Sequence, residues 1–72
     1  MDPVLKAITE MVYRHRDYTI NENLEVIVKG DGGVNFLVAW WSYTDLGDGR
    51  IEWQLQEQAG GSAACLEIAS SD

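Results

Sequence analysis

The sequence has little of what small proteins use to hold themselves together. It contains one cysteine, Cys65, and one proline, Pro3, in 72 residues. A single cysteine cannot form an internal disulfide, and a chain of this length lies near the lower limit for folding without disulfides, a metal or a partner chain. The cysteine usage fits a reducing, cytoplasmic setting. The short length by itself makes self-association an open prediction.

Basic residues are also scarce. Lys and Arg number 5 against 12 Asp and Glu, which gives a formal net charge of −7. Phosphate backbones and anionic membrane surfaces repel such a chain, so we expect neither direct nucleic-acid binding nor membrane binding. The charge has two interpretations. It keeps a small protein soluble, or it steers the protein to a basic partner surface, as in inhibitors that mimic nucleic acid.

Long apolar runs and catalytic motifs are missing as well. No stretch approaches the roughly 20 apolar residues that span a bilayer, and no basic-then-apolar signal segment opens the chain. His15 is the single histidine of the chain, so a metal site built from two histidines is excluded. Cys65 lies among small apolar residues, which is typical of a core position. The turn at 45–49 lacks the further acids of a calcium loop. We therefore expect a soluble protein that is not an enzyme, with no metal and no cofactor.

What the sequence does have is one strongly apolar stretch, residues 34–43. Successive side chains of a strand point to opposite faces, so both faces of this strand are apolar. One face would carry Val34, Phe36, Val38 and Trp40, and the other Leu37, Ala39, Trp41 and Tyr43. Such a strand is either buried on both sides or leaves an apolar face exposed.

The segments around this strand have recognisable patterns. Asp2-Pro3 is typical of a helix start, and apolar residues at three- and four-residue spacing predict an amphipathic helix over 3–16, with His15 half-buried on its apolar stripe. Residues 24–29 read as a strand that the glycine-rich turn at 30–33 joins to the central strand, with Val28 opposite Val34.

The C-terminal half predicts two more strands. Residues 51–57 alternate cleanly between apolar and polar side chains, and a Gly60-Gly61 turn would pair them with 63–69. The alternative is a helix from Ser62. That would give the order α-β-β-β-α, like that of a double-stranded-RNA-binding domain, although the acidic charge and the absence of a Lys-rich helix start argue against that function.

Together these patterns predict a single α+β domain over residues 1–72, with one N-terminal helix packed on a four-stranded antiparallel meander (α-β-β-β-β), and α-β-β-β-α as the alternative. The sheet face without the helix would carry Ile27, Leu37, Ala39, Trp41 and Tyr43. If the loop after Thr44 is one residue longer than the four residues 45–48, the apolar side chains of 51–55 move to the Trp41 face.

We expect this uncovered face to bind protein, either a second copy in a sheet-mediated homodimer or a basic partner. The candidate interaction residues are Ile27, Leu37, Trp41, Tyr43, Asp45, Asp48 and Glu52. In size and charge the chain is similar to inhibitors and accessory proteins encoded by phages and other mobile elements, which implies inhibition of a basic, nucleic-acid-binding protein. The alternative is a structural or small-ligand-binding subunit whose apolar face is used up in its own oligomer.

Overall fold

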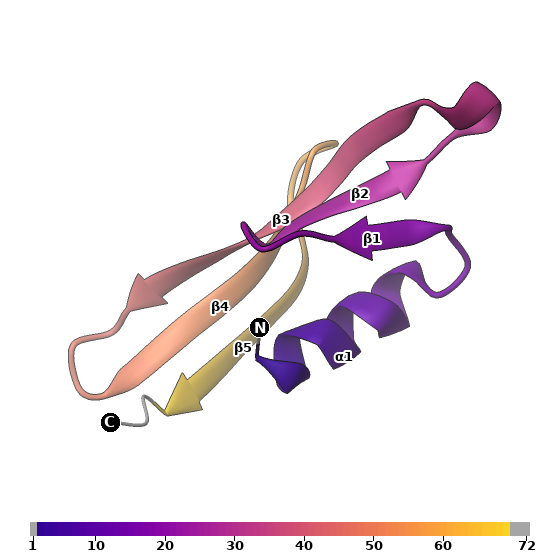
Figure 1. Cartoon of the computed structure of the whole chain (residues 1–72). Coiled ribbons are helices and arrows are strands. Elements are labelled where there is room, and N and C mark those ends of the chain that lie inside the picture. Colours follow the sequence, from indigo (N-terminus) through magenta and orange to yellow (C-terminus); the bar gives the residue numbers. More distant parts are fainter. Residues whose placement is uncertain (1, 70–72) are drawn as a thin grey trace.

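The computed structural model describes residues 2–69, which form one helix beside one five-stranded antiparallel sheet (Figure 1). The strands lie side by side in chain order, so the sheet is a meander. The elements are α1 (Pro3–Tyr13), β1 (Tyr18–Ile20), β2 (Glu25–Lys29), the short 3-10 turn η1 (Asp31–Gly33), β3 (Asn35–Asp45), β4 (Arg50–Glu57) and β5 (Ser62–Ala69). The α+β class is confirmed. The strand count of four was wrong, and Ser62–Ala69 is a strand instead of the alternative helix.

The helix begins as predicted and ends early. A carboxylate oxygen of Asp2 accepts a hydrogen bond from the Val4 N–H at 2.9 Å, with Pro3 in the first turn. The helix stops at Tyr13 because the chain must turn back to form β1, and the Lys29 N–H donates to the Asp17 carbonyl at 2.9 Å at the start of that strand. His15 therefore lies beyond the helix and is exposed, not half-buried on its stripe.

The unpredicted strand is β1, at one edge of the sheet. It pairs Tyr18 with Val28 and Ile20 with Val26. Three residues are too few to show the two-residue period of a strand, so no strand was predicted here. The Asn21 side-chain oxygen accepts hydrogen bonds from two following backbone N–H groups, and Leu24 takes a left-handed conformation (φ 62°) to close this turn.

A single extra residue in β3 decides which side chains form the core. Ile27 lies opposite Leu37, but Val26 lies opposite Ala39, so Val38 has no partner across the ladder. Such a bulge moves every later side chain of the strand to the other face. The Val38 carbonyl instead accepts a hydrogen bond from the Gln58 N–H at 2.8 Å, which ties the bulge to the turn after β4.

Because of the bulge, Trp41 lies under the helix. Its side chain is 5% exposed, and its indole N–H donates to the Thr9 hydroxyl at 2.8 Å. That hydroxyl donates in turn to the Leu5 carbonyl at 2.8 Å. The expectation that Ala39, Trp41 and Tyr43 lie on the sheet face without the helix was wrong. The buried apolar residues are Leu5, Tyr13, Val26, Val28, Ala39, Trp41 and Leu55.

The last two strands keep apolar residues opposite one another. Trp41 lies opposite Leu55 and Tyr43 opposite Trp53, so the apolar side chains of 51–55 lie on the Trp41 face, as in the alternative. The strands themselves leave the four residues 46–49 between them, because β3 runs to Asp45 and β4 begins at Arg50, and the pair nearest the turn is Asp45 with Ile51. A Gly60-Gly61 turn would place Trp53 opposite Ile68. In the structure Trp53 lies opposite Leu66, a shift of two residues along β5. A two-residue shift leaves every side chain on its expected face. Cys65 falls on the polar side and is exposed, not a core residue.

The helix is too short to cover its sheet. Eleven helical residues span about 16 Å, whereas the 11 residues of β3 span about 36 Å. The molecule is accordingly elongated, 46 × 23 × 19 Å. Figure 1 shows the ends of β3, β4 and β5 reaching past the start of α1. No helix within residues 2–69 is long and apolar enough to cross a membrane.

Candidate functional site

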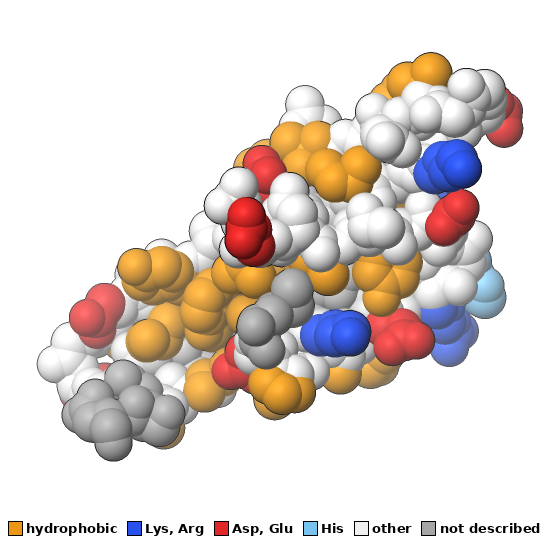
Figure 2. Space-filling view, viewed as in Figure 1, with side chains coloured by type: hydrophobic (Ala, Val, Ile, Leu, Met, Phe, Trp, Pro, Cys, Tyr) orange, Lys and Arg blue, Asp and Glu red, His pale blue; other side chains and the backbone are white. Residues whose placement is uncertain are grey.

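The part of the helix-side face that α1 does not reach is apolar. We call it the distal patch, and it consists of Tyr43, Ile51, Trp53, Leu66 and Ile68. Tyr43 is 65% exposed, and its ring packs against that of Trp53 with the centroids 5.2 Å apart. Figure 2 shows apolar side chains gathered over this end of the sheet. Within residues 2–69 the patch continues the core pattern, with Tyr43 exposed and the other four side chains half-buried.

An acidic rim borders the distal patch. It consists of Asp45, which shares the patch face, Asp48 in the following turn, and Glu52 and Glu67, which alternate with the patch residues along β4 and β5 and so lie on the opposite face, with Arg50 among them. Arg50 bonds Asp48 at 2.9 Å and Glu67 at 3.0 Å. The hydrogen bond from Arg50 to Asp48 and then the charge of Glu67 raise the pKa of Arg50 above its ordinary value.

One guanidinium cannot balance four carboxylates. Glu52 lies directly opposite Glu67 across β4 and β5, a like-charge pairing that destabilises a sheet. The Glu52 carboxylate accepts a hydrogen bond from the Gln54 amide at 2.9 Å, which does not supply a charge. The rim therefore keeps an excess of negative charge at this end of the sheet, with Asp45 on the same face as the exposed Tyr43 ring.

The structure brings together four of the seven residues predicted as an interaction site. Tyr43 belongs to the distal patch, and Asp45, Asp48 and Glu52 belong to the acidic rim at the same end of the sheet, although Glu52 lies on the opposite face from Tyr43. The other three lie elsewhere, because Trp41 is buried and Ile27 lies opposite Leu37 before the bulge. Trp53 was missed as a partner of Tyr43, although the 51–55 alternation was the signal.

The face away from the helix is mostly polar between the bulge and the β3–β4 turn. Two side-chain hydrogen bonds run along its central strand. The Gln56 amide N–H donates to the Gln54 side-chain oxygen at 2.5 Å, and the Gln54 amide N–H donates to the Glu52 carboxylate at 2.9 Å. Ser42 and Thr44 lie beside these side chains, with Trp40 opposite Gln56. The expected apolar surface on this side is thus largely absent within residues 2–69, because the bulge turned it under the helix.

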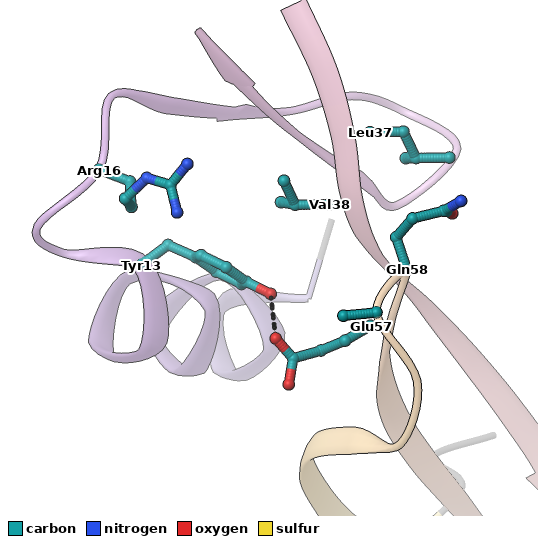
Figure 3. A pocket seen from close by; sticks show the side chains of 7 residues that line it. Tyr13, Arg16, Leu37, Val38, Glu57 and Gln58 are labelled. Atoms are coloured by element: carbon teal, nitrogen blue, oxygen red, sulfur yellow. Dashed lines mark hydrogen bonds between the residues drawn. The ribbon is translucent and has the colours of Figure 1, made fainter. Parts of the chain in front are cut away.

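A surface hollow of about 340 Å³ lies where the bulge meets the end of the helix (Figure 3). It is lined by Tyr13, Arg16, Leu37, Val38, Glu57, Gln58 and Ala59. The Tyr13 hydroxyl donates to the Glu57 carboxylate at 3.3 Å. Burial first, and the negative charge of Glu57 second, raise the pKa of Tyr13, so the phenol stays protonated and remains a donor.

Within residues 2–69 no group of three or more His, Cys, Asp or Glu side chains is arranged to hold a metal ion. Comparison of the chain with protein-family models, with curated proteins and with solved structures found no match.

Proposed function

We propose that this chain is a non-enzymatic module that binds a basic protein surface through its distal patch and acidic rim. One observation carries the proposal: Tyr43 is 65% exposed on the face that forms the core two residues earlier, with the Asp45 carboxylate two residues further along the same face. An aromatic anchor surrounded by a polar rim is the usual anatomy of a protein interface.

The two parts of the surface have different roles in binding. An aromatic side chain buries about 150–250 Å², and about 25 cal/mol per Å² makes burial of Tyr43 with its Trp53 neighbour worth several kcal/mol before association costs are subtracted. The rim adds little affinity but raises the rate of encounter with a basic partner and repels acidic ones.

In its finer form the proposal makes the chain an inhibitor of a nucleic-acid-binding protein, of the kind that phages and other mobile elements encode. The support is the formal charge of −7 on 72 residues, together with the acids on one end of an elongated molecule. Carboxylates at that end would occupy a groove that otherwise holds phosphates.

The test is affinity capture from extracts of the source cells, followed by binding measurements on the purified partner. Tyr43→Ser removes the anchor, and the double change Asp45→Asn with Asp48→Asn removes two charges from the rim. The matched control, Glu22→Gln with Asp31→Asn, removes two charges from exposed turns away from the distal patch.

We expect a protein with a high isoelectric point that binds the wild type and the control equally. Tyr43→Ser should weaken binding at least about tenfold, the size of effect of losing an interface anchor. The rim variant should weaken it less and reduce its dependence on salt. A partner that binds Tyr43→Ser as tightly as the wild type would contradict the proposal.

A further inference from the structure

Strand β5 leaves its outer edge unpaired within residues 2–69, since the strand order ends at β5 and β4 is its neighbour. Proteins commonly protect such edges with lysine, proline or very short strands. The opposite edge follows this practice, because β1 has three residues. Strand β5 has eight residues, Ser62–Ala69, with neither lysine nor proline and Glu67 as its charged side chain. It has a bulge near its start, where Ala63 is an extra residue opposite Leu55 and Gln56, and the six residues 64–69 form the regular part of the edge.

The surface area also indicates a missing neighbour. The chain exposes 5011 Å². A folded monomer of 8.0 kDa exposes about 4,450 Å², so the excess is about 550 Å². That excess approaches the roughly 800 Å² that each partner buries in a standard interface.

We propose that a second copy of this chain pairs with β5, edge to edge and antiparallel, about a twofold axis, so that the two sheets become one. Twofold antiparallel pairing places even-numbered residues opposite even-numbered ones. The helix-side residues Ala64, Leu66 and Ile68 therefore meet one another in every symmetric register, and both helices lie on the same side of the joined sheet.

Charge selects the register. With Cys65 opposite Cys65 of the second copy, Ala64 faces Leu66, and the two Glu67 carboxylates lie about 13 Å apart along the strands. With Leu66 opposite itself, the two Glu67 side chains become diagonal neighbours, and like charges at that distance repel.

This dimer does not depend on the proposed function, and salt separates the two. Copies that each carry a charge of −7 repel, so the dimer should strengthen as salt screens the repulsion. Binding of a basic partner should weaken under the same change. The distal patch includes Leu66 and Ile68, so pairing at β5 would also place two Tyr43–Trp53 surfaces on one face.

The first experiment is absolute mass by light scattering behind a sizing column, at several concentrations and at low and high salt. Cys65→Lys places two lysines against each other on the twofold axis. Thr19→Lys is the matched control, an exposed residue in the middle of the other edge strand. We expect a wild-type dimer that salt strengthens, a monomer for Cys65→Lys and a dimer for Thr19→Lys, with circular dichroism showing that both variants are folded.

The second experiment reports the register. Diamide oxidises two thiols to one disulfide and accepts the two electrons and two protons itself. In the proposed dimer it should give a covalent dimer rapidly, and Cys65→Ser should give none. A wild type that stays monomeric at every concentration and salt, a Cys65→Lys chain that still dimerises, or a dimer whose Cys65 does not crosslink would each overturn the β5 pairing, while leaving the capture experiment to decide the proposed function.

Discussion

The middle and the distal end of one sheet face have the same sequence pattern and different environments. In the middle, Trp41 lies opposite Leu55 and is 5% exposed under α1. Two residues further along, Tyr43 lies opposite Trp53 and is 65% exposed. The difference comes from helix length, because the rise per residue of a helix is less than half that of a strand. The same alternation thus forms a core where the helix reaches and a binding surface where it does not.

The largest effect should separate these two positions. Trp41→Ala should lower the free energy of unfolding by about 3–5 kcal/mol, because it leaves a cavity in the core and removes the indole N–H that donates to the Thr9 hydroxyl. Tyr43→Ala should lower it by only about 1 kcal/mol, mainly through the lost packing on Trp53. Urea denaturation measures both. Equal losses would mean that the two positions do not differ as described.

The hydroxyl of Thr9 should have the next largest effect. Thr9→Val keeps the side-chain shape but leaves the Trp41 indole N–H without an acceptor, which should cost about 1–3 kcal/mol. Thr9→Ser is the control because it keeps the hydroxyl, and urea denaturation compares the two variants. If Thr9→Val is as stable as the wild type while Thr9→Ser is not, packing of the methyl group and not the hydrogen bond holds the helix on Trp41.

Tyr13→Phe should cost about 1 kcal/mol through loss of the hydrogen bond to Glu57. Its effect should depend on pH. The pKa of Tyr13 is raised in the fold, so its contribution is complete below the ordinary tyrosine pKa near 10 and is lost as pH rises through the raised value.

Wild-type stability should therefore fall more steeply than that of Tyr13→Phe in alkaline solution. Burial also raises the pKa of Tyr18, so the stability of both proteins still falls somewhat as the pH rises through that range. Chemical denaturation across the alkaline range provides the comparison, and parallel curves for the two proteins would contradict the assignment.

The smallest effect on stability should come from Arg50. Its ion pairs with Asp48 and Glu67 are about half exposed and screened by solvent, so Arg50→Gln should change stability very little, as urea denaturation would show. The same change makes the acidic rim more negative. It should therefore tighten binding of a basic partner at low salt, and weaker binding would show that Arg50 itself contacts the partner.

Much of the fold follows from local chemistry. Asp2-Pro3 marked the helix start, and the glycines at 60 and 61 marked the last turn. Strand β4 alternates so cleanly that its faces were unambiguous. The C-terminal strand followed from its pairing with β4, and a two-residue error in register did not matter because it preserves faces.

The faces of β3 could not be predicted, for a physical reason. Both sets of alternate side chains in 34–43 are apolar, so burial does not favour one register over the other and a one-residue bulge leaves no trace in the pattern. The bulge depends on a long-range bond, from the Gln58 N–H to the Val38 carbonyl. The candidate site was therefore found in part: Tyr43 and its neighbouring acids were identified, while Trp41 was placed on the surface.

Hydrogen exchange at the three tryptophan indole N–H groups, followed by NMR, tests the bulge most directly. We predict slow exchange at Trp41, whose N–H is buried against Thr9, and faster exchange at the half-exposed Trp40 and Trp53. Single Trp→Phe variants assign the three signals. A protected Trp40 with a rapidly exchanging Trp41 would mean that β3 runs without the bulge, and that the surface lies on the opposite face of the sheet.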